Sequence, residues 1–444
     1  MRSLRAVTSV AALAIGLSLG AGPASAAPDG ADGGLWYYTR TGVEAAQAET
    51  TGEGVTIAVL DGPVNPAAPD LVGANLVVRD SYCHTLDGTR SETATDATAE
   101  HATSIVSLLV GTGAGAGGQP GVRGVAPGAT VLHYSVYAPG WSEDLPLDER
   151  PVCFDADGQA DAGGEVADAI DDAVAQGAQI ISMSSGGWWN LRIGEAVARA
   201  YAAGVVIVAA PSNEGGYSPR YPAEGNGVVM VEMADSALQL DEGSYTTIHP
   251  YMGVVAPGAD ILAPRPGDGS WQSYGLSAGT SLATPWTAGV LALAWSQHPE
   301  ATGNQMIQAL IRTTGVENEE PAHDERWGYG PVSVARLLAS DPTGYPDENP
   351  FLRPLEDENA VPTTRQVLDA VAAAGPPAEA PTPSPEPSEE PGAAQPAPPA
   401  EADAGVAVLP IALGAGAVLV AALVVALVLH RRRTAATSAA RREP

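Results

Sequence analysis

The stretch "SAGTSLATPWTAG", residues 277–289, places one serine between a Gly-Thr pair and a run of small and apolar residues. The apolar run continues to Trp295, so we expect a helix that begins close to Ser281, with Pro285 in its first turn, where proline is tolerated. The backbone N–H groups of a first helical turn attract negative charge. Ser281 is therefore either a cap of this helix or a nucleophile beside an anion-binding helix start.

A nucleophilic serine needs a base, and the base needs a carboxylate that orients it. Asp61 directly follows the apolar run "VTIAVL", and His101 opens the apolar stretch "HATSIVSLLVG". Each of these residues alone would be interpreted as a turn or helix-cap residue. Together, their order and their positions at the ends of apolar elements favour one shared site with Ser281. Three other histidines are candidate bases: His84 in a polar loop, His133 in a strand-like run and His323 in an acidic loop. None of them has a comparable placement.

Apolar runs rich in β-branched residues alternate with helix-like stretches in the first half of the chain. Buried strands are predicted at residues 55–60, 179–183 and 205–209, and helices at residues 101–110, 164–175 and 193–202. This alternation is typical of a doubly wound α/β fold, with a mostly parallel sheet, helices on both faces and ligands at the carboxyl ends of the strands.

The two ends of the chain carry signals of export and membrane insertion. Residues 1–26 combine Arg2 and Arg5, an apolar stretch and the small residues "ASA", which predicts a signal peptide. Residues 406–429 contain no charge and are closely followed by three arginines, which predicts a transmembrane helix and a basic cytoplasmic tail at residues 430–444. The protein is therefore predicted to be anchored in the cell membrane by a single span, with its folded part outside the cytoplasm.

Between these ends the composition divides the chain into three parts. Residues 27–50 form an extension too short for a core of its own, and "GLWYYTRTG" predicts an extended arm held by aromatic side chains. Residues 51–352 form one folded domain. Residues 353–404 are a Pro-, Ala- and Glu-rich spacer with one short helix predicted at residues 364–373. The formal net charge of -31 argues against nucleic acid as a partner.

The exported part contains two cysteines, Cys83 and Cys153. Outside the cytoplasm an even number favours a disulfide, here Cys83–Cys153, over two free buried thiols. Cys153 lies in an acidic loop, residues 137–164, for which a solvated surface loop is the preferred interpretation; calcium binding and attraction of a basic substrate segment are the alternatives. No His/Cys cluster has the spacing of a zinc site, and no glycine-rich segment forms a phosphate loop, so no metal or other cofactor is predicted.

Several segments resemble those of the subtilisin-family serine proteases, in the same order along the chain. "GEGVTIAVLDG", "HATSIVSLLVG" and "GTSLATPWTAG" resemble the family's Asp, His and Ser segments, and "GVAPGA", "YPA", "VVAPGADILAP" and "WGYGPVSVARLL" resemble further signatures. The resemblance covers roughly residues 52–338. It implies a serine endopeptidase with Ser281 as nucleophile, His101 as general base and then acid, and Asp61 as the orienting carboxylate.

The resemblance also implies residues that bind the oxyanion and the substrate. "VVIVAAPSNEGG" resembles the strand that leads to the family's oxyanion asparagine, which falls on Asn213; an ordinary turn asparagine is the alternative. "SMSSGG" resembles the edge strand that pairs with the substrate backbone, and its matching residues are Ser184, Ser185 and Gly186.

The order of segments along the whole chain resembles that of the mycosins, proteases associated with type VII secretion systems. These segments are the signal peptide, the protease domain, the Pro-rich spacer, the single C-terminal helix and the basic tail, and "YPDENP" at residues 345–350 is similar to the segment that closes the mycosin catalytic domain. This resemblance implies a protein substrate handled by the secretion machinery. The alternative, from a different class, is a weakly active or inactive protease-fold scaffold that stabilises a membrane secretion complex.

Three departures from the family pattern lie beside catalytic groups. After Asp61 the chain has Gly62 and Pro63, where the family has Ser or Thr followed by Gly. After His101 it has Ala102 where the family has Gly, and before Asn213 it has Pro211 and Ser212 where the family has Ala and Gly. Each departure changes the conformational freedom of the backbone. Strain follows if Ala102 or Ser212 has to adopt a positive φ. The departures predict a slow or selective protease.

Overall fold

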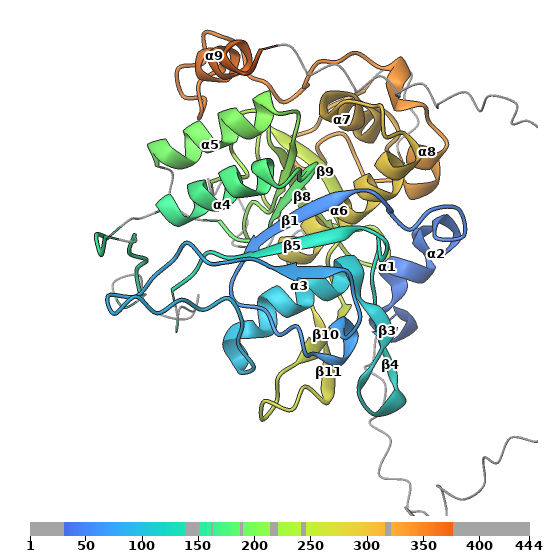
Figure 1. The fold of residues 1–444 in the computed structure, drawn as a ribbon. Coiled ribbons are helices and arrows are strands. Elements are labelled where there is room, and N and C mark those ends of the chain that lie inside the picture. Colours follow the sequence, from blue (N-terminus) through green and yellow to red (C-terminus); the bar gives the residue numbers. More distant parts are fainter. Residues whose placement is uncertain are drawn as a thin grey trace, which may run out of the picture. The chain divides into compact units, whose positions relative to one another are not determined.

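A seven-stranded sheet lies at the centre of the fold (Figure 1). The computed structural model describes residues 31–138, 140, 149, 151–155, 157–160, 163–186, 190–213, 221–240, 246–315 and 321–375. The strands run in the order β2-β5-β1-β6-β7-β8-β9, and neighbouring strands pair in parallel. Their bounds are β1 Thr56–Asp61, β2 Leu76–Val78, β5 Thr130–Ser135, β6 Ile180–Met183, β7 Val206–Ala209, β8 Val229–Ala234 and β9 Met252–Pro257.

Apolar, β-branched sequences explain why these strands form the interior of the sheet. Strands β6, β7 and β8 are buried along their whole length, and β1 is buried after its first residue. Continuous burial is expected for parallel strands that are covered on both faces. The three strands predicted from the sequence are β1, β6 and β7, within one residue at either end.

Helices cover both faces of the sheet (Figure 1). Helices α3 and α6 share a hydrophobic core with Ile57 and Val59 of β1, whereas α4 and α5 pack with Ala58 and Leu60, which point to the opposite face. Helices on both faces of a parallel sheet confirm the predicted doubly wound α/β fold. The bounds are α3 Glu100–Val110, α4 Gly164–Ala175, α5 Leu191–Ala202, α6 Thr280–Gln297, α7 Gly303–Arg312, α8 Val334–Leu338 and α9 Thr364–Ala374.

Two antiparallel hairpins lie outside the main sheet. Strand β3, Thr112–Ala114, pairs with β4, Pro120–Arg123, and strand β10, Ile261–Arg265, pairs with β11, Ser273–Ser277. The second hairpin ends three residues before α6, so it leads the chain directly into the serine segment.

The N-terminal extension is docked on the body through aromatic side chains. The Trp36 indole donates to the Ala259 carbonyl (2.9 Å), and the Tyr37 hydroxyl donates to the Arg123 carbonyl (2.8 Å). Both aromatic residues are buried, so they anchor the extension as predicted. The expectation of an extended arm is wrong, because the segment folds into two short helices, α1 Trp36–Thr39 and α2 Val43–Ala46.

The disulfide Cys83–Cys153 joins two loops that are 70 residues apart in the sequence. The residues that follow the two cysteines, His84 and Phe154, exchange backbone hydrogen bonds of 3.2 and 2.9 Å. The loops are therefore linked both covalently and by hydrogen bonds, and the pairing predicted from the cysteine count is present.

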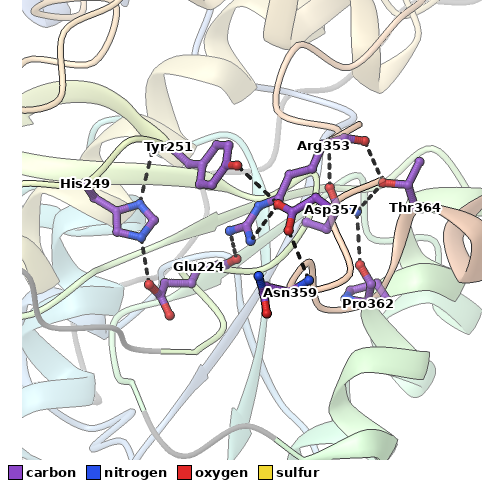
Figure 2. Close-up of polar contacts among 9 residues, drawn as sticks. Glu224, His249, Tyr251, Arg353, Asp357, Asn359, Pro362 and Thr364 are labelled. Carbon is purple, nitrogen blue, oxygen red and sulfur yellow. Dashed lines mark hydrogen bonds and ion pairs between the residues drawn. The ribbon is translucent and has the colours of Figure 1, made fainter. Parts of the chain in front are cut away.

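The chain remains folded past Leu352, where composition predicts the start of the spacer. Figure 2 shows the Arg353 guanidinium, which donates to the Glu224 carbonyl (2.7 Å) and lies 3.9 Å from the centroid of the Tyr251 ring. The Thr364 hydroxyl donates to the Arg353 carbonyl (2.6 Å), and helix α9 packs on α5. The folded part therefore extends further than expected, because these long-range contacts are not visible in the local composition.

The predicted signal peptide, transmembrane helix and basic tail lie outside the described residues. No helix within the described ranges has both the length and the apolar character needed to cross a membrane.

Candidate active site

The predicted site residues gather at the carboxyl edge of the sheet. From β1 the chain continues to β2 and β5 on one side of β1, and then crosses to β6 on the other side. The strand order therefore changes direction between β1 and β6. Ligands of α/β proteins bind at such a switch point. Asp61 is the last residue of β1, and Ser184 directly follows β6. His101 lies in the first turn of α3, and Ser281 lies in the first turn of α6.

His101 is oriented by Asp61 through a hydrogen bond. Its Nδ1 lies 2.8 Å from Asp61 Oδ1, and the Gly62 backbone N–H donates to the same oxygen (2.7 Å). The Asp61 side chain is 1% exposed, whereas the His101 side chain is 46% exposed. A buried carboxylate that accepts from Nδ1–H selects the tautomer in which Nε2 is the basic nitrogen. The pair can therefore accept a proton from a group bound at the surface.

Ser281 and Ser184 form a reciprocal pair of hydrogen bonds between α6 and the end of β6. The Ser281 hydroxyl donates to the Ser184 carbonyl (2.9 Å), and the Ser184 hydroxyl donates to the Ser281 carbonyl (2.7 Å). The Ser281 carbonyl has no helical partner because Pro285, four residues later, carries no N–H. The helix begins at Thr280, so Pro285 lies in its second turn and not in the first as expected. Ser184 replaces the missing helical hydrogen bond.

The predicted substrate-binding segment continues the chain beyond β6. Ser184 is buried, Ser185 is partly buried and Gly186 is exposed. An exposed backbone that prolongs a strand can pair with an extended peptide. The accessible part of this segment therefore lies at Ser185 and Gly186, while Ser184 has a second task in holding Ser281.

Asn213 reaches the start of α6 from the loop after β7. Its Oδ1 accepts from the Thr280 backbone N–H (3.0 Å) and from the Thr280 hydroxyl (3.2 Å). Because a backbone N–H can only donate, the amide oxygen faces Thr280 and the NH2 group faces elsewhere. A Cβ at Gly279 would lie 3.3 Å from Asn213 Nδ2 and 3.7 Å from the Ser281 nitrogen. Both nitrogens, together with Asn213 Oδ1 at 3.5 Å, therefore lie around Gly279.

The departures from the family pattern do not strain the backbone at the site. Within the described ranges, four residues other than glycine have a positive φ, namely Asp32, Leu238, Asp260 and Trp271. Neither Ala102 nor Ser212 is among them. Ala102 is a buried residue of helix α3, so its side chain packs in the core and does not enter the surface of the site.

Two buried ionisable residues close to the site were not selected from the sequence. His133 of β5 and Glu232 of β8 are fully buried. Each interrupts an apolar run, "TVLHYS" and "VMVEMA" respectively. A single ionisable residue inside a buried strand is costly unless it is neutral or paired, and this is the signal that could have identified both.

Glu232 supports the loop that precedes Asn213. Its Oε1 accepts from the Met233 backbone N–H (2.8 Å) and its Oε2 accepts from the Thr247 backbone N–H (2.7 Å). The Thr247 hydroxyl in turn donates to the Ser212 carbonyl (3.5 Å). Burial raises the pKa of Glu232 to about 8, although these hydrogen bonds act in the opposite direction.

The raised pKa of Glu232 predicts a stability that falls as the pH rises. Between the ordinary pKa of 4.5 and about 8, the folded protein keeps the proton and the unfolded chain releases it. In this window the free energy of unfolding should fall by about 1.4 kcal/mol per pH unit through this group, and level off above it. Urea unfolding across the window should show that Glu232→Gln loses this slope. An equal slope in both proteins would assign it to other groups.

No metal site is present among the described residues: no three His, Cys, Asp or Glu side chains are grouped to hold an ion. The acidic loop around Cys153 is described only in part, and several of its carboxylates lie outside the described residues.

The chain is similar in sequence to several serine proteases. It is 32% identical to the halolysin-like extracellular serine protease Nep of Natrialba magadii over 187 residues, 42% of this chain and 33% of that protein. It is 31% identical to the thermostable alkaline protease of Halalkalibacterium halodurans over 268 residues, 59% of this chain and 62% of that protein. It is 30% identical to thermitase of Thermoactinomyces vulgaris over 269 residues, 59% of this chain and 81% of that protein. The chain thus spans less than two thirds of the length of the first two relatives.

Solved structures show the same fold. Fervidolysin from Fervidobacterium pennivorans superposes with a TM-score of 0.55 at 25% identity, covering 72% of this chain and 48% of that one. The psychrophilic subtilisin-like protease Apa1 from Pseudoalteromonas sp. AS-11 superposes with a TM-score of 0.55 at 18% identity, covering 70% of this chain and 99% of that one.

A family model also matches most of the folded part of the chain. The model of the subtilase family, Peptidase S8, matches residues 52–330. This range contains all seven strands of the main sheet and the residues Asp61, His101, Asn213 and Ser281. Sequence, fold and site geometry agree, and the chain belongs to the subtilase family, Peptidase S8.

Proposed function

We propose that this protein is a serine endopeptidase in which Asp61, His101 and Ser281 form the catalytic triad. The proposal depends above all on the 2.8 Å hydrogen bond between His101 Nδ1 and Asp61 Oδ1. The second support is the position of Ser281, which contacts the end of β6, the strand beside β1. Membership of the subtilase family supports the same chemistry. The substrate is a peptide or protein, and the residues named supply the reaction without a cofactor.

The first half of the reaction transfers the acyl part of the substrate to Ser281. Ser281 Oγ attacks the carbonyl carbon of the peptide bond while His101 Nε2 takes the hydroxyl proton. The oxyanion that forms accepts hydrogen bonds from the Asn213 NH2 group and the Ser281 backbone N–H. The C–N bond then breaks, and His101 gives its proton to the leaving amine.

The second half of the reaction frees the enzyme. A water molecule gives a proton to His101 and attacks the ester on Ser281. His101 then returns the proton to Ser281 Oγ as the ester bond breaks and the carboxyl product leaves. Asp61 keeps its negative charge throughout and stabilises the protonated imidazole of His101.

Replacing Asn213 with alanine is expected to lower kcat by about 100- to 1000-fold with little change in KM. The lost NH2 group acts on the oxyanion of the transition state and much less on the neutral carbonyl of the bound substrate. The measurement is steady-state hydrolysis of a fluorogenic peptide. Asn226→Ala is the control, because Asn226 is a buried asparagine that bonds the Pro362 carbonyl (3.0 Å) outside the site. Equal losses of kcat in both variants would remove Asn213 from the oxyanion site.

The proposal is tested by labelling the full-length chain with a fluorophosphonate probe. Ser281 Oγ should displace fluoride from phosphorus while His101 takes the proton. Mass spectrometry should find one added phosphonyl group, on the peptide that contains Ser281. Heat-unfolded protein, with the same residues but no assembled site, should take up none. Label on a different residue, or no label on the folded protein, would favour the alternative of a non-catalytic scaffold.

We also propose that the protease is anchored outside the cytoplasm and acts with a type VII secretion system, as mycosins do. The supporting features are the sequence signals at residues 1–26 and 406–429, the spacer and the segment "YPDENP". Membrane fractions of cells that express the full chain should contain it, and a chain that ends at Ala374 should appear in the medium. Release of the full-length chain into the medium would contradict the anchor.

A further inference from the structure

A group of polar atoms behind Asp61 has no hydrogen-bond partner within the described part of the chain. Asp61 Oδ1 accepts from His101 and Gly62, whereas the buried Oδ2 accepts from no described donor. The same is true of three neighbouring groups: both ring nitrogens of His133 and the hydroxyls of Ser135 and Ser182. Because buried polar groups are normally hydrogen-bonded, such a concentration next to one carboxylate calls for a common explanation.

The strand register places these four side chains on one face of the sheet. Asp61 is paired with Ser135 of β5, and Val59, two residues earlier in β1, is paired with His133 of β5 and Ser182 of β6. Residues that are paired across parallel strands, or two apart in one strand, point to the same face. Val59 belongs to the core beneath α3 and α6, so all four polar side chains face that layer.

His133 is the natural donor within this group. Burial lowers the pKa of His133 to about 4, while the Asp61 charge and the Gly62 backbone act in the opposite direction. The ring is therefore neutral near pH 7, with one N–H donor and one acceptor nitrogen. His133 lies diagonally opposite Asp61 on the neighbouring strand, because Asp61 is paired with Ser135, two residues later in β5. Gly62, the next residue in the chain, offers a backbone N–H but no side-chain donor.

We propose that His133 is a positioning residue for the catalytic Asp61, whose Oδ2 it stabilises with its ring N–H through one buried water. Ser135 and Ser182, whose hydroxyls also have no described partner, are the other polar side chains that such a water can reach. A carboxylate held at both oxygens keeps Oδ1 on His101 and keeps its charge away from the apolar core. The inference rests on the proposed function, because it assigns His133 a task in the Asp61–His101 pair.

The test is the pH dependence of fluorophosphonate labelling of the full-length chain. His133→Phe keeps a planar ring and removes the N–H. The pair of Asp61 with neutral His101 carries one negative charge, whereas the pair with protonated His101 carries none. Loss of the donor therefore destabilises the reactive, negatively charged form. The acid limb of the rate profile should therefore move up by about one pH unit.

Two further variants separate positioning from packing. His133→Asn keeps an N–H donor and should return the acid limb part of the way to its wild-type position. Tyr134→Phe is the matched control on the same strand, because the Tyr134 hydroxyl donates to Asp172 (2.8 Å) on the opposite face of the sheet. It should leave the profile unchanged. Glu100, which precedes His101 and is paired with Arg265, is kept in every variant.

The outcomes distinguish this inference from the proposed function. If wild-type Ser281 does not react, the triad and the role of His133 both fail. If the wild type reacts and His133→Phe has the wild-type profile, only the role of His133 is wrong. An equal shift in His133→Phe and Tyr134→Phe would also overturn it, since both would then act through general packing. If His133→Phe does not fold, His133→Leu takes its place. The role of His133 is then wrong if His133→Leu has the wild-type profile, or if His133→Asn has the same profile as His133→Leu.

Discussion

Replacing Ser281 with alanine is expected to lower kcat for peptide hydrolysis by about a million-fold. The substitution removes the only atom that can form the acyl-enzyme, whereas the oxyanion donors and the substrate-binding backbone stay in place. KM should therefore change little. The measurement is hydrolysis of a fluorogenic protein substrate by the purified full-length chain, with active-site titration of the wild type as reference.

Ser296→Ala is the matched control for this substitution. Ser296 lies near the other end of α6, where its hydroxyl donates to the Leu293 carbonyl (2.8 Å). It should retain wild-type kcat. Ser281→Ala also loses its hydrogen bond to the Ser184 carbonyl, which should lower the free energy of unfolding by only about 1 kcal/mol. A Ser281→Ala protein that keeps a tenth of the wild-type activity would exclude Ser281 as the nucleophile.

Replacing Asp61 with asparagine is expected to lower kcat by about 10,000-fold. The amide NH2 group would donate to His101 Nδ1, so the imidazole would carry its proton on Nε2 and could not act as a base. The geometry supports a large effect, since Asp61 Oδ1 lies 2.8 Å from Nδ1 and is buried from water. Initial rates near neutral pH measure the loss.

Asp70→Asn separates catalysis from stability in this comparison. Asp70 is also fully buried, but its carboxylate accepts from the Tyr274 hydroxyl (2.7 Å) and the Val122 backbone N–H, outside the triad. We expect a lower melting temperature and an unchanged kcat. Equal losses of kcat in Asp61→Asn and Asp70→Asn would show that Asp61 acts by supporting the fold alone.

Much of the fold could be predicted because its signals are local. Strands β1, β6 and β7 are short apolar runs, and helices α3, α4 and α5 have apolar residues at helical spacing. Asp61, His101 and Ser281 stand at the ends of such elements, which is why the sequence predicts that they share one site. The C-terminal contacts of Arg353 could not, since they join residues more than one hundred positions apart.

Other parts of the site depend on which strands become neighbours. His133 has no visible partner in its own run "TVLHYS", and its relation to Asp61 exists only because β5 pairs with β1. Pro285 leaves the Ser281 carbonyl without a helical donor, and only the folded chain supplies Ser184, 97 residues away, as its replacement.

The sequence by itself determined the α/β class, the order of the proposed catalytic groups and their places at the ends of elements, because periodicity and capping act over a few residues. The tertiary structure alone decided the orientation of the Asn213 amide, the placement of His133 on the same face of the sheet as Asp61, and the docking of residues 31–50 and 353–375. These depend on hydrogen bonds between distant residues, and such bonds are defined only once strand order and register bring the partners together.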